Sequence, residues 1–351
     1  MHTQEDDYID PDEAQQRQNT FACSTIAILP WNSGRFRVAD VLQAAPRNHG
    51  RVELLEDLET KELLIAKVMP LSWMRSTHDE FLQEYPDETE MPWRDACITQ
   101  YLAERLGPSH VCEFKGVFRR LPDDDTGAGK FHEAAEVPKG EQLCLVLSYC
   151  AGGDLFTWLQ RSLTSTEENF RSREVLAKPV IARLFQVVLD IHDVGVAHGD
   201  LSLENILLAT SKVGPSPIDL RLVDFACATG PVASGPRGKC AYQAPEIHSG
   251  LPYFAAVADT FALGVVAFTL TIGNYPWKST SPYACQLFCY FATYGLQAFL
   301  ARRKVRTKSC GVQPLLSVLS PELIDLLEGL LCVDPEQRRS LLAALNHEWF
   351  Q

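Results

Sequence analysis

The sequence contains 11 cysteines in 351 residues but no Cys-x-x-Cys pair. An odd number of cysteines without this spacing is not the pattern of a disulfide framework or a zinc site. No secretory signal peptide precedes them, so we expect reduced thiols. We therefore expect a cytoplasmic protein, and the sequence leaves the nucleus open as a second location.

Basic charge and long apolar runs are also scarce. The chain has 32 Lys and Arg against 45 Asp and Glu, which gives a net charge of -13. An acidic balance of this size argues against general nucleic-acid binding. The longest apolar run, residues 261–272, is too short to span a membrane. We expect neither a nucleic-acid nor a membrane partner.

The chain does have ample material for a core, because 46% of its residues are hydrophobic. Residues 1–33 form an acidic tail and lead-in, which we expect to be disordered at its start. Short β-like runs fill 34–147, with polar insertions at 70–91 and 122–141. Helical periodicity dominates 148–351. These patterns predict an α+β fold of two lobes, β-rich and then mainly helical, with a cleft between them.

The stretch 198–208 carries the strongest chemical signal. It places Asp200 five positions before Asn205, and Asp224 follows an apolar pair farther along. Together they predict an oxygen-rich pocket for Mg²⁺ with a proton acceptor for a hydroxyl group. Lys67 interrupts an otherwise apolar strand. It either extends along the surface of an edge strand or points into a cleft at an anion.

These motifs resemble those of eukaryotic protein kinases over roughly residues 34 to 350, in the order and near the spacing of that family. The fold that this resemblance implies is the same two-lobed fold. The motifs that carry it are Ile65-Ala66-Lys67, His198 to Asn205, Asp224-Phe225-Ala226, Ala244-Pro245-Glu246, Asp259 to Gly264, Asp334 to Arg338 and Asn346 to Phe350.

The resemblance implies that ATP binds in the cleft. Lys67 would hold the α- and β-phosphates, and Leu147 would gate the adenine pocket. Asp154 would meet the ribose or cap the helix that follows it, and both roles are compatible. The residues implied to bind nucleotide are Gly50, Val52, Ala66, Lys67, Leu147, Ser148, Cys150, Asp154 and Asp224.

The resemblance also assigns the chemistry. Asp200 would accept the proton of the substrate hydroxyl, with Lys67 and Asn205 as its catalytic partners, and Asn205 and Asp224 would hold Mg²⁺. Asp95 stands where the family has the glutamate that orients Lys67. The residues with implied structural or regulatory roles are Asp95, His198, Phe225, Glu246, Asp259 and Arg338, of which Arg338 would pair with Glu246.

Several positions depart from the family pattern. The glycine loop at 45–50 retains only Gly50, although glycines let the backbone approach phosphates closely. Gly199 replaces an arginine that reads an activation-segment phosphate, so that switch should be weak or absent. Ser202 replaces the lysine that neutralises the transferred phosphate. Ala226 replaces a glycine, which restricts the backbone there.

Two hypotheses follow. The first is a protein kinase that transfers the γ-phosphate of Mg-ATP to serine or threonine hydroxyls of a protein substrate. The alternative is a pseudokinase that binds nucleotide or acts as a scaffold with little or no phosphate transfer. We favour the first, because Lys67, Asp200, Asn205 and Asp224 are all present.

Overall fold

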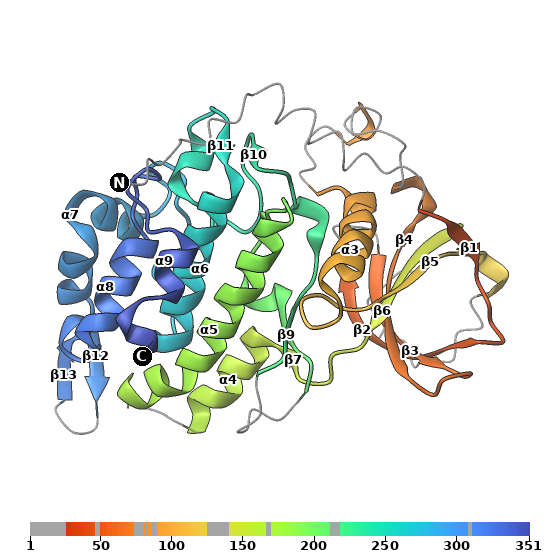
Figure 1. The fold of residues 1–351 in the computed structure, drawn as a ribbon, viewed down its shortest axis with the longest axis horizontal. Helices are drawn as coiled ribbons and strands as arrows, with labels where there is room; N and C mark the ends of the chain where they lie inside the picture. Colours follow the sequence, from red (N-terminus) through yellow and green to blue (C-terminus); the bar gives the residue numbers. More distant parts are fainter. Residues whose placement is uncertain are drawn as a thin grey trace, which may run out of the picture.

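The computed structural model describes residues 26–45, 50–73, 81, 83–85, 90–124, 140–165, 170–210, 218–307 and 311–351. Most of the acidic tail, positions 46–49 of the glycine loop and much of both insertions lie outside the described residues. Figure 1 shows the sheet and α3 at one end of the molecule and helices α4 to α9 at the other. The predicted two-lobed α+β fold is confirmed.

The first lobe is built on a six-stranded sheet in the order β1-β5-β6-β4-β3-β2. All pairings are antiparallel except β1 with β5. Strand β1 precedes the expected lobe boundary at residue 34 and still belongs to this sheet. The strands are β1 Ile28–Pro30, β2 Phe36–Ala45, β3 Gly50–Asp57, β4 Leu63–Pro70, β5 Phe114–Arg120 and β6 Gln142–Ser148.

Alternation along the strands gives the sheet two different faces. One face carries a cluster that includes Leu64, Ala66 and Val68 of β4. The opposite face carries Leu145 and Leu147 of β6, packed with α3 (Pro92–Leu106). Lys67 therefore lies on the face that looks toward α3 and the other lobe.

A buried ionic network lies on the same face as Ala66. The carboxylate of Glu53 accepts hydrogen bonds from Arg120 Nη1 at 2.9 Å and from Arg51 Nε at 2.6 Å. Gln142 accepts a further bond from Arg120 Nη2 at 3.0 Å. All four side chains are buried, so this network joins β3, β5 and β6 through charges removed from water.

The second lobe is mainly helical. Its longer elements are α4 Leu155–Ser165, α5 Phe170–Asp193, α6 Ala255–Ile272, α7 Gln286–Arg302, α8 Pro321–Leu330 and α9 Leu341–Leu345. Its strands are β7 Gly153–Asp154, β8 Ile206–Leu208, β9 Leu220–Leu222, β10 Val232–Ala233, β11 Tyr253–Phe254, β12 Lys304–Thr307 and β13 Gly311–Pro314. The 3₁₀ turns of both lobes are η2 Leu71–Trp73, η3 Pro122–Asp124, η4 Leu203–Asn205, η5 Phe225–Cys227, η6 Pro245–His248, η7 Leu315–Ser317 and η8 Glu348–Phe350.

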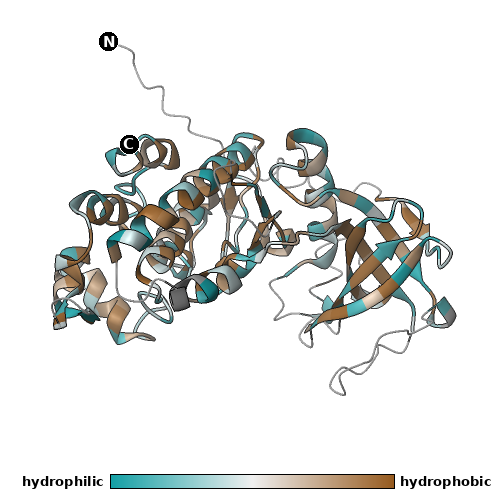
Figure 2. Cartoon of the chain, turned by 90° about the horizontal axis from the view of Figure 1, so that it is seen from below, coloured by the Kyte–Doolittle hydropathy of each residue, from teal (hydrophilic) through white to brown (hydrophobic). Residues whose placement is uncertain are grey.

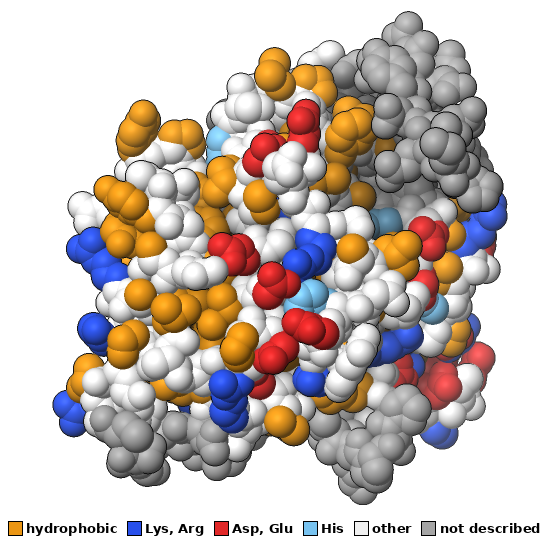
Figure 3. All heavy atoms as spheres, turned by 60° about the vertical axis from the view of Figure 1, so that its left-hand side comes forward, with side chains coloured by type: hydrophobic (Ala, Val, Ile, Leu, Met, Phe, Trp, Pro, Cys, Tyr) orange, Lys and Arg blue, Asp and Glu red, His pale blue; other side chains and the backbone are white. Residues whose placement is uncertain are grey.

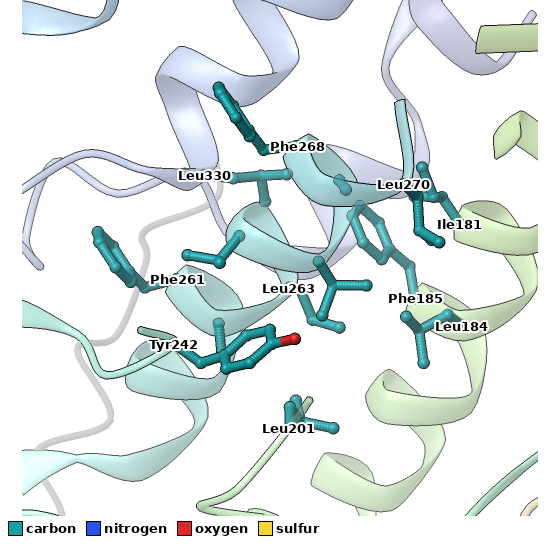
Figure 4. Packing of buried hydrophobic residues seen from close by; sticks show 14 of the residues in the cluster. Ile181, Leu184, Phe185, Leu201, Tyr242, Phe261, Leu263, Phe268, Leu270 and Leu330 are labelled. Carbon is teal, nitrogen blue, oxygen red and sulfur yellow. The ribbon is translucent and has the colours of Figure 1, made fainter. Parts of the chain in front are cut away.

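Helix α6 is the centre of this lobe. The sequence predicts a fully buried helix over 257–272, and nearly every residue of α6 is buried. Figure 4 shows Leu263 of α6 on the side of Phe185 of α5 and Phe268 near Leu330 of α8, whereas Phe261 points away from α5. By length and composition its 18 residues could cross a membrane, but 83% of them are buried inside the protein, as in a core helix.

Helices α5 and α8 pack directly against α6, and Phe299 of α7 contacts Phe268 of α6. Figure 2 shows hydrophobic and hydrophilic residues alternating along most of them, the pattern of amphipathic helices. Figure 3 shows acidic, basic and hydrophobic side chains interspersed on the helical side of the molecule.

The cysteines differ in state. Cys112, Cys144 and Cys150 are buried free thiols, and Cys240 is an exposed one. Cys97 is disulfide-bonded. The expectation that all cysteines are reduced is therefore wrong for Cys97, since its spacing to the other cysteines carried no sign of a bond.

Candidate active site

Lys67 lies in β4 and points toward two carboxylates. Its Nζ atom is 2.7 Å from Oδ2 of Asp95 and 3.1 Å from Oδ1 of Asp224. Burial alone would lower the pKa of Lys67, but the charges of Asp224 and Asp95 outweigh it and raise the pKa. The lysine is therefore a fixed positive charge that links the two lobes.

Asp95 connects helix α3 to the segment that follows Asp224. Its Oδ1 atom accepts hydrogen bonds from the backbone N–H of Phe225 at 2.8 Å and from Thr99 Oγ1 at 3.3 Å. The start of α3 lies close to the same segment, because Met91 N donates to Ala226 O at 3.1 Å. This close approach explains how an aspartate reaches Lys67, although its side chain is one methylene shorter than glutamate.

The catalytic stretch, residues 198–208, contains η4 and then β8, the middle strand of a small sheet in the order β7-β8-β9. The Nδ2 atom of Asn205 donates to the backbone oxygen of Asp200 at 2.8 Å and to its Oδ2 at 2.9 Å. Asn205 O also accepts from Val223 N at 3.1 Å, which brings the strand before Asp224 alongside. Backbone pairing of β8 with β9 thus brings Asp200, Asn205 and Asp224 together. In the sequence, Asn205 lies five positions after Asp200 and nineteen before Asp224.

Asp259 of α6 holds the start of this stretch. Its carboxylate accepts from the backbone N–H groups of His198 at 2.7 Å and Gly199 at 3.0 Å. The ring of His198 contacts Val223 O through Nε2 at 3.1 Å and packs on Phe225 with centroids 4.9 Å apart. Through these contacts His198, Phe225 and Asp259 hold the backbone next to Asp200 and Asp224 in place.

Gly199 has a conformational reason that the sequence does not reveal. Its φ angle is +73°, and an added Cβ atom would lie 2.5 Å from Cys227 O. A side chain at position 199 would therefore clash with the backbone of the neighbouring segment. This packing is a physical reason for the absence of a side chain at position 199.

The two acids differ in environment. Burial raises the pKa of the Asp200 carboxyl, whereas Lys239 and His198 act in the opposite direction. Burial would also raise the pKa of Asp224, but Lys67 outweighs it and lowers the pKa. A raised pKa suits a proton acceptor, and a lowered pKa suits a carboxylate that binds a cation.

A cavity of about 490 Å³ lies between the lobes. Lys67, Asn205 and Asp224 line its inner end, and a second cavity of about 570 Å³ extends it past Asp200. Predicted nucleotide-binding residues that line the first cavity are Gly50, Val52, Lys67, Cys150, Asp154 and Asp224.

Three predicted binding residues lie elsewhere. Ala66 is fully buried on the opposite face of the sheet, because adjacent residues of a strand point to opposite sides. Ala66 does not line the cavity, whereas the neighbouring Ile65 does. Leu147 is buried in the cluster behind the cavity. Ser148 turns away, since its Oγ atom accepts from Glu113 N at 2.9 Å.

Three apolar residues that line the cavity were not predicted from the sequence. Ile65, Leu207 and Val223 supply apolar surface, and each comes from a different strand or strand end. Asp154 combines two roles, because it lines the cavity and also accepts hydrogen bonds from Thr157 N at 2.7 Å and Thr157 Oγ1 at 3.1 Å. It therefore caps α4.

Arg338 and Glu246 form an ion pair far from the cavity. Arg338 Nη1 is 2.6 Å and Nη2 is 2.9 Å from the two carboxylate oxygens of Glu246. The arginine side chain is fully buried, and its guanidinium also lies over the ring of Phe261 at 5.1 Å. The pair fixes the end of the segment that starts at Asp224 onto α6.

The donor set suits Mg²⁺. The amide nitrogen of Asn205 is used on Asp200, which leaves the amide oxygen for a cation, and Asp224 is ionised beside it. Among the described residues, no group of three or more His, Cys, Asp or Glu side chains could hold a metal. Magnesium sites of one or two protein ligands are completed by phosphate and water oxygens, so the residues fit a nucleotide-bound ion.

Comparison with known proteins points in the same direction. Residues 51–350 match the family model of the protein kinase domain. The chain is 27% identical over 226 residues to maternal embryonic leucine zipper kinase of Xenopus laevis, covering 63% of this chain and 30% of the relative. It is 26% identical over 234 residues to serine/threonine-protein kinase cds1 of Schizosaccharomyces pombe, covering 64% and 44%. The chain thus spans less than half the length of these relatives.

Proposed function

Because this chain belongs to the protein kinase family, we propose that it transfers the γ-phosphate of Mg-ATP to serine or threonine hydroxyls of a protein. The observation that carries the proposal is the convergence of Lys67, Asp200, Asn205 and Asp224 on connected cavities between the lobes. The name of the Schizosaccharomyces pombe relative, a serine/threonine-protein kinase, supports serine and threonine as the acceptors.

The proposed binding mode follows from the cavity lining. Val52, Ile65 and Leu207 form apolar surface that suits the adenine ring. Lys67 lies at the inner end and holds phosphate oxygens as a point charge. Asp95 keeps Lys67 in place through the 2.7 Å contact.

The proposed chemistry uses Asp200 as the proton acceptor of the substrate hydroxyl. Asn205 holds the Asp200 side chain at 2.9 Å, so the carboxylate is oriented before a substrate arrives. Asn205 and Asp224 would hold Mg²⁺, which supplies neutralisation of charge on the phosphates. Catalysis in this arrangement rests on positioning and on electrostatic stabilisation.

Substitution of Asp224 by alanine tests the proposal. We expect Mg-ATP at about 100 times its Kd to stabilise the native chain by roughly 2.7 kcal/mol. We also expect the native chain to transfer phosphate to a basic protein. The variant should lose most of the stabilisation and most of the transfer. Thermal unfolding with and without Mg-ATP measures binding, and phosphoamino-acid analysis of the product identifies the acceptor hydroxyl.

Asp193→Ala is the matched control, because Asp193 is exposed at the end of α5. It should behave as the native chain does. Stabilisation without transfer would favour the nucleotide-binding pseudokinase instead. If the native chain showed neither stabilisation by Mg-ATP nor phosphate transfer, the enzyme hypothesis would be overturned.

Asp95→Asn tests the link between the lobes separately. The amide keeps an oxygen for Phe225 N but removes the charge that faces Lys67. Because hydrogen bonds to charged groups contribute about 1.5–3 kcal/mol, we expect kcat/KM for ATP to fall about 10- to 100-fold.

Glu104→Gln on the exposed side of the same helix is the control and should leave kcat/KM unchanged. Equal values for Asp95→Asn and the native chain would mean that Asp224 alone is enough to place Lys67.

A further inference from the structure

The cavity beside Asp200 has an unusual charge balance. Its lining includes four acids, Glu90, Asp200, Glu204 and Asp224. Among the described residues that line it, Lys239 is the only lysine or arginine. A phosphoryl group in transfer carries negative charge, and an acid-rich cavity would repel it without a cation nearby.

Lys239 is tied to the catalytic stretch at both ends. Its backbone N–H donates to Oδ1 of Asp200 at 2.8 Å. Its Nζ atom donates to Ser202 Oγ at 2.7 Å and lies 3.1 Å from Oε2 of Glu204. The lysine comes from the segment after Asp224, yet its ammonium group lies on the stretch that contains Asp200.

Gly238 makes this approach possible. Its φ angle is +72°, and an added Cβ atom would lie 2.7 Å from Asp200 Oδ1 and 2.6 Å from Gly199 O. A residue with a side chain would therefore push the segment away from Asp200. The contact of Lys239 with Asp200 and Ser202 is built into the backbone.

We propose that Lys239 is a catalytic residue that supplies the positive charge for the transferred phosphoryl group, with Ser202 as its positioning residue. The inference deepens the proposed kinase function and rests on it. The lysine missing from the catalytic stretch at position 202 is thus replaced by a lysine from a neighbouring segment.

The place of the reacting phosphorus follows from the step itself. The acceptor hydroxyl oxygen forms a bond to the γ-phosphorus, the bond from that phosphorus to the bridging oxygen breaks, and ADP leaves. The hydroxyl proton passes to Asp200. The phosphorus must therefore lie one hydroxyl group away from Asp200, within reach of a lysine whose own backbone touches that carboxylate.

The present partner of Lys239 is easily exchanged. The side chains of Lys239 and Glu204 are 42% and 41% exposed, and ion pairs of this kind contribute about 0–1 kcal/mol. The long lysine side chain can rotate from Glu204 to a phosphate while its backbone stays fixed. Glu204 therefore holds the ammonium group ready between turnovers.

Exchange of the two side chains tests the assignment. We expect Lys239→Ser to lower kcat by about 10²- to 10³-fold, the effect of removing one group that stabilises transition-state charge. KM for ATP should change little. The double variant Ser202→Lys with Lys239→Ser returns a lysine to the same place and should recover at least about tenfold of the loss.

Two further variants keep the test independent of how the double variant folds. Lys239→Met keeps the length of the side chain and should lose activity as Lys239→Ser does, whereas Lys239→Arg keeps the charge and should retain more. Lys304→Ser, at an exposed position on β12, is the control and should have native kcat.

A binding measurement separates this inference from the proposed function. Mg-ADP with aluminium fluoride mimics the phosphoryl group in transfer. It should raise the unfolding temperature of the native chain more than that of Lys239→Met, even if no protein substrate is turned over. Equal kcat and equal stabilisation for the two chains would overturn the assignment of Lys239. If the native chain transferred no phosphate but was still stabilised more than Lys239→Met by Mg-ADP with aluminium fluoride, only the proposed function would be overturned.

Discussion

Replacement of Asp200 by asparagine should lower kcat by about 10³-fold, because the amide cannot accept the proton of the substrate hydroxyl. The shape of the site should persist. An asparagine oxygen still accepts from Lys239 N, and Asn205 still donates to the backbone oxygen of residue 200 at 2.8 Å. Stabilisation by Mg-ATP should therefore remain close to that of the native chain. Initial rates at saturating Mg-ATP and thermal unfolding measure the two effects.

Asp193→Asn, the same change at an exposed position seven residues earlier, should leave both values native. If Asp200→Asn kept a tenth or more of the native kcat, the carboxylate would not be the proton acceptor. A loss of stabilisation by Mg-ATP as well would instead place Asp200 in nucleotide binding.

Glu53→Gln should lower the free energy of unfolding by about 3 kcal/mol or more. The carboxylate is 1% exposed and faces two arginines, Arg51 and Arg120, which are buried as well. The glutamine keeps the shape but removes the negative charge, which leaves two guanidinium charges in the sheet without their carboxylate partner. Urea unfolding followed by tryptophan fluorescence measures the change.

Glu56→Gln is the matched control, since Glu56 lies three residues farther along β3 and pairs with Arg37 at the surface. Exposed pairs contribute about 0–1 kcal/mol, so the control should differ little from the native chain. Equal losses for the two variants would show that burial does not set the strength of the Glu53 network.

Local patterns were sufficient for the architecture. The helical period over 257–272 and its lack of a polar face predicted the buried helix that the structure contains. The β-like runs around Lys67 became β3 and β4 of the sheet. These predictions succeeded because alternation and helical periodicity depend on neighbouring residues, and the sequence displays them directly.

Resemblance to a motif did not by itself show on which face of the strand a side chain lies. Ala66 was predicted to bind nucleotide from the resemblance of Ile65-Ala66-Lys67 to a kinase motif. Adjacency in a strand means the opposite face, so Ile65 lines the cavity and Ala66 lies in the outer cluster. The two-residue alternation that predicted the strand also places Ile65 on the face of Lys67 and Ala66 on the opposite face.

The amino-acid sequence by itself determined the family, the two-lobed fold and the identity of Lys67, Asp200, Asn205 and Asp224, because ordered motifs and local periodicity are properties of the chain alone. Only the tertiary structure decided how Asp95 reaches Lys67, why position 199 has no side chain and where a second lysine meets Asp200. Each of these depends on contacts between segments far apart in the sequence, such as Lys239 on Ser202. Their geometry is set by the packing of whole elements, which no local pattern encodes.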